Sequence, residues 1–258
     1  MSQILISEKQ NRILNLTLNR PEKKNALNAE LISALKAELR HAATASDVKV
    51  IIIKAAGDVF SSGADLESLQ AMQQFSFEQN LADSNHLREL LELIYLHPKI
   101  IIAQIHGHAI AGGCGLATVC DFSFAAEEAK FGYTEVGIGF IPALVSAFLI
   151  RKIGEGKARE LLLTGKLVTA SEAVRFGLIN EVLPNEMLSV AVNSFAEKLI
   201  ANVSSNSISA TKRLINDVQN VPLNESLNTA SKMNAETRSS NDCKHGIQSF
   251  LTKNKPSW

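Results

Sequence analysis

Hydrophobic residues recur along this chain in two spacings, and each spacing predicts a different kind of element. Between Ile13 and Asn19 apolar and polar residues alternate, which is the period of a half-buried strand. Two continuous apolar runs, Val48 to Ala55 and Ile100 to Ile105, are rich in β-branched residues and predict strands buried on both faces. Ile4 to Ile6 precedes a polar turn at 8–11, so we expect it to form a hairpin with the alternating strand.

Apolar residues three and four positions apart predict helices elsewhere in the first two thirds of the chain. The helix after Asn28 has a capping residue and an apolar stripe, and a longer helical segment at 67–96 contains a break near 73–80. Glycine and proline end the remaining helices and strands. These remaining elements are helices at 143–153 and 155–164, a short helix from Thr169 to Gly177, and a strand at 179–183.

Strand patterns disappear after Asn185. The rest of the chain predicts three or four helices, with a loop at 203–209 where serine and asparagine are frequent. Mixed strands and helices followed by helices alone are typical of an α/β core with a helical appendage. We therefore expect a core over residues 1–195 and a C-terminal helical region over residues 196–258.

The stretch from Ile100 to Pro142 contains the pattern that points to chemistry. Its strand runs into the glycine-rich turn 111–115, and a helix-like segment follows at 116–120. A helix that begins at such a turn leaves backbone N–H groups free to bind an anion or a developing oxyanion. The same succession occurs around Gly63, so two N–H groups are predicted to converge on one oxygen. A lone carboxylate, Glu135, follows in a second strand-like piece.

Composition and charge exclude several classes of function. The chain has 258 residues, with 26 lysines plus arginines and 26 aspartates plus glutamates, so its net charge is zero. Such a balance gives no attraction toward nucleic acid or an anionic membrane surface. Three cysteines without CxxC spacing favour a reducing compartment. We see neither a signal peptide nor an apolar run of about 20 residues, and we expect a cytoplasmic protein.

Several motifs in a fixed order resemble the enoyl-CoA hydratase/isomerase (crotonase) superfamily. They cover nearly the whole chain and are Asn25 to Asn28, Phe60 to Leu66, Ile105 to Asp121, Phe131 to Glu135, Gly137 to Pro142 and Phe250 to Lys253. The resemblance implies an α/β fold, namely a crotonase-like spiral of ββα units followed by a C-terminal helical trimerisation region. It also implies an acyl-CoA thioester as substrate, and a homotrimer or a dimer of trimers.

The resemblance further implies roles for single residues. By motif position, the N–H groups of Ala64 and Gly112 bind the thioester oxygen as it becomes enolate-like, and one such donor is worth roughly 2.7–4 kcal/mol. Glu135 matches the glutamate that moves a proton, and apolar neighbours are expected to raise its pKa. Coenzyme A is then part of the substrate, and neither a separate cofactor nor a metal is expected. Substrate contacts are expected at Lys24, Ala26, Leu27, Ser62, Asp65, Leu66, Gly113, Pro142, Phe250 and Lys253.

Position 115 departs from the pattern of hydratases that use two glutamates. They carry the second, water-orienting acid there, and this chain has Gly115. Dienoyl-CoA isomerases carry an aspartate there and another at the position of Ala143, which argues against that subgroup. Single-glutamate members include Δ3,Δ2-enoyl-CoA isomerases and members similar to methylglutaconyl-CoA hydratases, whose loop the run from Glu135 to Ala143 resembles. Hydration of a 2-enoyl-CoA is the leading hypothesis, isomerisation by Glu135 alone is the alternative, and a non-catalytic acyl-CoA binder is a third.

Other polar residues near the motifs have simpler interpretations. We expect His106 and His108 to be hydrogen-bonded structural histidines. Ser61 lies in no G-x-S-x-G motif and has no assigned base partner, so a serine nucleophile is not expected. Cys114 is expected to pack in the interior, and Asp65 to brace a loop or cap a helix more than to act as an acid.

Overall fold

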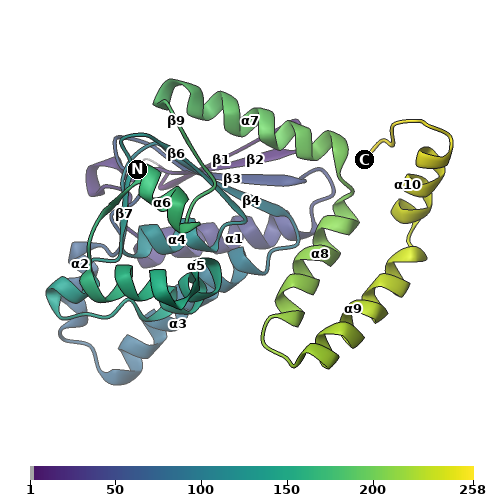
Figure 1. Ribbon diagram of the computed structural model, residues 1–258. Coiled ribbons are helices and arrows are strands. Elements are labelled where there is room, and N and C mark those ends of the chain that lie inside the picture. The colour runs from purple at the N-terminus through teal and green to yellow at the C-terminus, as the bar shows by residue number, and fades with distance from the viewer. Residues whose placement is uncertain (1–2) are drawn as a thin grey trace.

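The computed structural model describes residues 3–258, and the chain folds around a six-stranded sheet with a smaller three-stranded sheet (Figure 1). The larger sheet has the order β1-β2-β3-β4-β6-β9, in which β1 and β2 are antiparallel and the other pairs are parallel. The smaller sheet has the order β5-β7-β8. The strands are β1 (Leu5–Gln10), β2 (Ile13–Leu18), β3 (Val50–Ala55), β4 (Ile100–Ile105), β5 (Ala109–Ile110), β6 (Phe122–Ala126), β7 (Lys130–Gly132), β8 (Val168–Thr169) and β9 (Glu181–Leu183).

Helices cover both faces of the larger sheet. Residues of α1, α3 and α4 pack in the core on one face, and residues of α7 pack in the core on the other. The α-helices are α1 (Ala29–Thr44), α2 (Leu66–Met72), α3 (Phe77–Tyr95), α4 (Gly112–Val119), α5 (Ala143–Thr164), α6 (Ala170–Phe176), α7 (Asn185–Asn202), α8 (Ser205–Val218), α9 (Leu223–Arg238) and α10 (Asn241–Leu251). Two short 3₁₀ helices are η1 (Pro21–Lys23) and η2 (Glu135–Ile138).

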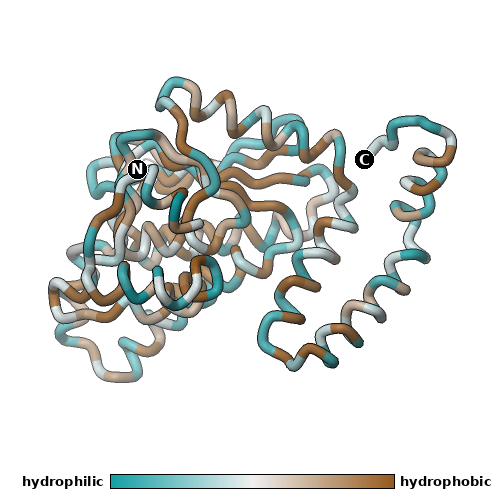
Figure 2. The backbone as a smooth tube through the Cα atoms, in the orientation of Figure 1, coloured by the Kyte–Doolittle hydropathy of each residue, from teal (hydrophilic) through white to brown (hydrophobic). Residues whose placement is uncertain are grey.

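The central strands are buried on both faces, as their apolar runs predicted. In β3, Ile51 and Ile53 point into the larger core, whereas Val50 and Ile52 point into the core under α7. Figure 2 shows this concentration of hydrophobic residues in the central strands. A parallel strand between two helical layers has no solvated face, which explains why these runs lack polar alternation.

Local signals predicted several element boundaries correctly. The Asn28 side chain accepts a hydrogen bond from the Leu31 N–H at 2.9 Å and caps α1. The predicted break in the segment 67–96 separates α2 from α3, which begins with a capping box at Ser76. Gly154 has non-helical dihedral angles and interrupts α5 where the sequence predicted two helices.

Four expectations about element type or extent were wrong. The hairpin turns at Asn11 and Arg12, both with positive φ, and not over residues 8–11. The segment 203–209 belongs mostly to α8, because Ser204 caps a helix there. The helix expected at 116–120 begins earlier, at Gly112, and Glu135 lies in the 3₁₀ helix η2 and not in a strand.

The helices at the end of the chain extend away from the sheets. In Figure 1, α8 descends beside the core, and α9 and α10 form an arm on the far side of it. Residue 195, the predicted end of the core, falls within α7, which still packs on the sheet. The division of the chain into two parts there stays a prediction. Within residues 3–258, no helix combines the length and the apolar character needed to cross a membrane.

Candidate active site

The two glycine turns predicted to supply backbone donors lie against each other. A Cβ atom built on Gly63 would lie 3.0 Å from the Gly112 nitrogen, and the φ of Gly63 is 89°, so both the contact and the conformation favour glycine. The segments that lead into the two turns are joined by a backbone hydrogen bond of 2.9 Å from Ile110 to Ser61. The tertiary structure therefore brings the segment around Ala64 next to the start of α4.

Ala64 and Gly112 both have backbone N–H groups that donate to no other group in residues 3–258. Gly112 is the first residue of α4, so its N–H has no acceptor within the helix. A Cβ atom built on Gly112 would lie 3.6 Å from the Cα of Gly63. The positive end of the α4 dipole adds to the attraction for negative charge. Two free amides in neighbouring turns suit the binding of one carbonyl oxygen that gains charge.

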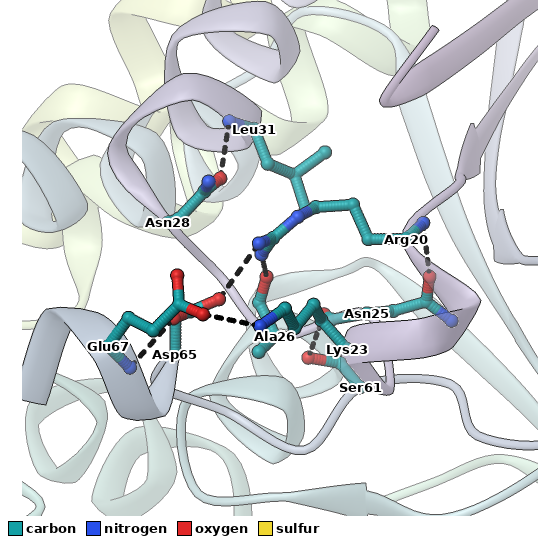
Figure 3. A network of polar contacts seen from close by, with 9 residues as sticks. All are labelled: Arg20, Lys23, Asn25, Ala26, Asn28, Leu31, Ser61, Asp65 and Glu67. Atoms are coloured by element: carbon teal, nitrogen blue, oxygen red, sulfur yellow. Dashed lines mark hydrogen bonds and ion pairs between the residues drawn. The ribbon is translucent and has the colours of Figure 1, made fainter. Parts of the chain in front are cut away.

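A polar network, shown in Figure 3, holds the Gly63 turn in place. Arg20 donates to the Asp65 carboxylate at 2.9 Å and to the Ala26 carbonyl at 2.6 Å, and both charged side chains are nearly buried. The other oxygen of Asp65 accepts from the Glu67 N–H at 3.0 Å and caps α2. Burial acts to raise the pKa of Asp65, but the bonds from Arg20 and the backbone outweigh it and lower that pKa. Asp65 therefore braces the turn, and its contact with substrate stays a prediction.

The loop before α1 runs beside the same turn and carries further predicted substrate contacts. Ser62 donates its N–H to the Lys24 carbonyl at 3.0 Å, and Leu27 donates to the Gly63 carbonyl at 2.7 Å. Leu27 and its neighbour Ala26 are buried, whereas Lys24 is exposed. Any contact that Ala26 and Leu27 make with a ligand therefore involves mainly their backbone.

Two further predicted contacts also lie along these turns. Gly113 is buried, and a Cβ atom built on it would lie 2.7 Å from the Ser61 Cβ, so Gly113 offers only backbone atoms. Leu66 begins α2, and its side chain lies outside what the structure describes.

Glu135 lies beyond β7, close to the start of α4. Strands β5 and β7 are parallel, and Ile110 pairs with Gly132. Gly112 lies two residues after Ile110, and Glu135 lies three residues after Gly132. Burial is the main cause that raises the pKa of the Cys114 thiol, in the first turn of α4, and the negative charge of Glu135 raises it further.

The environment of the Glu135 carboxyl differs from that of Asp65. Its Oε2 atom is buried and has no hydrogen-bond partner within residues 3–258. Burial raises the pKa of Glu135 above its ordinary range. Apolar neighbours in the sequence were expected to cause this; of these, Phe131 and Tyr133 are fully buried, whereas Ile138 is exposed to solvent.

The first turn of α5 packs against Gly115. A Cβ atom built on Gly115 would collide with Cγ1 of Val145 and would lie 3.3 Å from its Cβ. Val145 is itself buried in the first turn of α5. The half-buried Pro142 occupies the N-cap position of this helix. A side chain at position 115 thus has no room unless Val145 moves or becomes smaller.

Comparison with known proteins shows the family. A model of the enoyl-CoA hydratase/isomerase family matches residues 8–258. The chain belongs to the enoyl-CoA hydratase/isomerase family. A Thermus thermophilus protein assigned as an enoyl-CoA hydratase is 38% identical over 93% of this chain and 94% of its own length. The 2,3-dehydroadipyl-CoA hydratase of Escherichia coli is 34% identical over 99% of this chain and 98% of its own.

Solved structures show that this family member has the crotonase fold. An enoyl-CoA hydratase from Mycobacterium smegmatis superposes with a TM-score of 0.94 at 27% identity, covering 100% of this chain and 99% of that one. Human enoyl-CoA hydratase domain-containing protein 3 superposes with a TM-score of 0.93 at 29% identity, covering 99% and 100% of the two chains. These likenesses extend over α8, α9 and α10 as well as over the sheets.

In this enoyl-CoA hydratase/isomerase family member, Phe250 and Lys253 are not brought to the other predicted site residues. Phe250 is 82% exposed on α10, and Lys253 follows it. Figure 1 shows α10 on the opposite side of the core from α2 and β7, next to which the glycine turns and Glu135 lie. Their predicted role in binding substrate therefore cannot concern the site of their own chain in this conformation.

The other reactive side chains near the turns have structural roles. Burial raises the pKa of the Cys114 thiol to about 12, which keeps it protonated and unreactive. Ser61 is buried and donates its hydroxyl to the Asn25 carbonyl at 2.9 Å. The Nε2 atom of His106 lies 2.7 Å from the Gly57 carbonyl, as expected of a structural histidine.

Sequence reasoning missed the residues that hold the site together. Arg20 and Asn25 lie in a loop without periodicity, and their partners are up to 45 residues away. The sequence indicates Val145 only as part of an apolar helix. An apolar residue in a helix does not indicate which distant residue it will contact. A single sequence therefore carries no signal for the contact between Val145 and Gly115.

Proposed function

We propose that this chain hydrates a 2-enoyl-CoA thioester, with Glu135 as the single acid–base group. The observation that carries the proposal is the buried Glu135 oxygen, which has no hydrogen-bond partner among residues 3–258 and lies near a turn whose backbone amides donate to no group in that range. Membership of the enoyl-CoA hydratase/isomerase family supports the substrate class. The name of the Escherichia coli relative, a 2,3-dehydroadipyl-CoA hydratase, supports addition of water as the reaction.

In the proposed reaction, the thioester oxygen accepts hydrogen bonds from the N–H groups of Ala64 and Gly112. Glu135 removes a proton from water while the water oxygen bonds to C3 of the acyl chain, and the π electrons move toward the thioester oxygen. The protonated carboxyl then delivers that proton to C2. One C–O bond and one C–H bond replace the π bond between C2 and C3, and Glu135 returns to its starting state. A raised pKa suits this role because both protonation states must be reached near neutral pH.

The acyl group of the substrate is a finer part of the proposal. The run from Glu135 to Ala143 resembles members similar to methylglutaconyl-CoA hydratases, which supports a branched or carboxylated 2-enoyl group. No separate cofactor is needed, because coenzyme A activates the acyl group as part of the substrate.

A second candidate, isomerisation of a 3-enoyl-CoA to a 2-enoyl-CoA, is favoured by the contact between Gly115 and Val145. Since Val145 occupies the direction in which a side chain at 115 would point, a second acid has no room there. Isomerisation needs only one group, which removes a proton from C2 and returns it to C4. Glu135 alone meets that requirement.

Turnover of three thioesters separates these candidates. Purified protein is incubated with crotonyl-CoA, 3-methylglutaconyl-CoA and a 3-enoyl-CoA, and the absorbance of the 2-enoyl thioester is followed. Hydration lowers this absorbance with one of the first two substrates. Turnover of the 3-enoyl substrate alone replaces hydration by isomerisation.

A pair of matched variants tests the assignment of Glu135. Glu135→Gln is expected to lower kcat by about 10²–10⁴-fold. Glu128→Gln changes an exposed carboxylate after β6 and is expected to keep wild-type turnover. Full activity in Glu135→Gln would remove Glu135 from the reaction and leave the protein an acyl-CoA binder or an enzyme with another acid.

We also propose that the chain assembles with further copies of itself. Apolar side chains on the terminal helices are exposed in the single chain, which supports a homotrimer or a dimer of trimers that covers them. They include Leu223, Leu227, Ile247 and Leu251. The molar mass in solution, measured by light scattering, tests this part. A monomer at micromolar concentration would contradict it. The free cysteines support a reducing location such as the cytoplasm.

A further inference from the structure

A buried chain of hydroxyl groups connects the turn that carries Glu135 to the helix that begins at Gly112. The phenol oxygen of Tyr133 lies 2.6 Å from Oγ1 of Thr118, and Thr118 donates to the carbonyl of Cys114 at 2.8 Å. All three residues are buried, with Tyr133 fully so. The contacts therefore operate away from water, where hydrogen bonds are strong and their loss is felt.

The direction of these bonds follows from the hydrogen atoms available. A carbonyl only accepts, so the single hydroxyl hydrogen of Thr118 goes to Cys114. Tyr133 must then donate to Thr118. The series of hydrogen bonds runs from the phenol of Tyr133 through the hydroxyl of Thr118 to the backbone carbonyl of Cys114, in the first turn of α4.

The two ends of this series of hydrogen bonds lie close in sequence to the proposed catalytic groups. Tyr133 lies two residues before Glu135, and Cys114 lies two residues after Gly112. The backbone ladder between the two segments ends with the bond from the Ala111 N–H to the Gly132 carbonyl at 2.8 Å. Among the described residues, the phenol of Tyr133 supplies a further hydrogen-bonded link between the two segments, through Thr118.

We propose that Tyr133 is a positioning residue, whose hydroxyl bond to Thr118 fixes the Glu135 carboxyl relative to the Gly112 amide. This inference rests on the proposed function, because it assigns the geometry of the same reaction. The distance from Glu135 to C2 must be held closely, and a misplacement of about 1 Å costs on the order of 10²-fold in rate. Substrate binding through the coenzyme A moiety does not depend on the phenol.

Tyr133→Phe tests the inference with little risk to folding. Thr118 still donates to Cys114 in this variant, so no buried donor loses its acceptor. We expect kcat to fall about tenfold with KM within about twofold of wild type, because the acid is displaced while the binding surface is kept. Tyr95→Phe is the matched control, since the Tyr95 hydroxyl bonds to Gln219 outside the site, and it is expected to leave kcat unchanged.

Variants of Thr118 provide the second arm. Thr118→Ser keeps the hydroxyl and is expected to retain wild-type kcat, whereas Thr118→Val is expected to lose about as much as Tyr133→Phe. The double variant Tyr133→Phe/Thr118→Val should be no slower than the slower single variant, because both changes break one link. A purely structural role would lower the melting temperature of these variants without changing kcat per folded molecule.

The outcomes separate this inference from the proposed function. Loss of turnover in Glu135→Gln together with wild-type kcat in folded Tyr133→Phe would overturn the positioning role alone. Equal kcat in Thr118→Ser and Thr118→Val would overturn it as well, even if Tyr133→Phe does not fold. Absence of turnover by the wild-type chain with all three thioesters would overturn the proposed function and this inference with it.

Discussion

The two glycine turns meet at one place but are held there by different forces. The Gly63 turn is braced by side chains, chiefly the buried pair of Arg20 and Asp65. The turn at the start of α4 has no charged brace among the described residues and is positioned by close contacts that only glycine permits, at positions 113 and 115. A polar brace can be weakened in steps, whereas a steric contact tolerates no added atom, so the two turns should respond differently to substitution.

The largest effect is expected where the turns touch most closely. A Cβ atom on Gly113 would press into the Ser61 carbonyl oxygen, which is backbone and cannot rotate away. Gly113→Ala should therefore destabilise the fold by about 3 kcal/mol or prevent folding. Urea unfolding measures this.

Gly112→Ala is the matched control, because its added Cβ would meet ordinary contacts of 3.6 Å. It is expected to stay within about 1 kcal/mol of wild type. Equal stabilities of the two variants would show that the turns are less tightly packed than described.

The next largest effect is expected when the ion pair between Arg20 and Asp65, which braces the Gly63 turn, is removed. Asp65→Ala leaves the nearly buried guanidinium of Arg20 without its partner and should cost about 3 kcal/mol. Glu67→Ala removes an exposed carboxylate that pairs with Lys23 and should cost less than about 0.5 kcal/mol. Chemical denaturation of both variants gives the comparison. Similar small losses would mean that the Gly63 turn does not depend on charge.

A smaller effect tests the contact that supports the α4 turn from α5. Gly115→Ala should cost about 1–3 kcal/mol because its Cβ collides with Val145. In Gly115→Ala/Val145→Ala the two changes compensate, so the double variant should be more stable than the sum of the singles predicts, by about 1 kcal/mol. A double-mutant cycle of unfolding free energies measures the coupling, and additive losses would remove the steric argument.

The same contact also bears on the reaction. Gly115→Glu/Val145→Gly gives a second carboxyl the room that Val145 takes in the wild type. We expect this variant to raise the ratio of hydration to isomerisation relative to wild type, measured with the three thioesters. An unchanged ratio in a folded double variant would mean that position 115 does not face the reacting carbons.

The smallest effects concern the pH dependence of stability. The carboxyl groups of Asp65 and Glu135 should change stability with pH in opposite directions. The lowered pKa of Asp65 means that its stabilisation is present above its ordinary value of 3.8 and is lost as the pH falls through the folded-state pKa. The raised pKa of Glu135 means that the folded state binds its proton more tightly, so stability declines as the pH rises above 4.5. At neutral pH, Glu135→Gln should therefore be slightly more stable than wild type, and Asp65→Asn less stable.

Thermal melts between pH 3 and pH 8 check both signs. The advantage of Glu135→Gln should vanish below the ordinary pKa of glutamate, where the carboxyl is protonated in both folded and unfolded chains. A Glu135→Gln variant that loses stability at neutral pH would show that the carboxylate has a partner in solution.

Local signals determined much of the fold and the identity of the turns. The apolar runs of β3 and β4 gave buried parallel strands, and the caps at Asn28 and Gly177 marked helix ends, because periodicity and capping depend on neighbouring residues. The motifs around Gly63, Gly112 and Glu135 indicated the family before any contact was known.

The tertiary structure alone decided how those pieces meet. It paired Asp65 with Arg20 and placed Val145 against Gly115. It also buried a Glu135 oxygen that has no partner within residues 3–258, and it placed Phe250 away from the site of its own chain. Each of these facts joins residues far apart in sequence, or sets a residue against the packing of the whole molecule. Hydrophobic and polar spacing records only whether a position is buried, whereas the identity of the neighbour depends on how helices and strands pack, which one sequence does not encode locally.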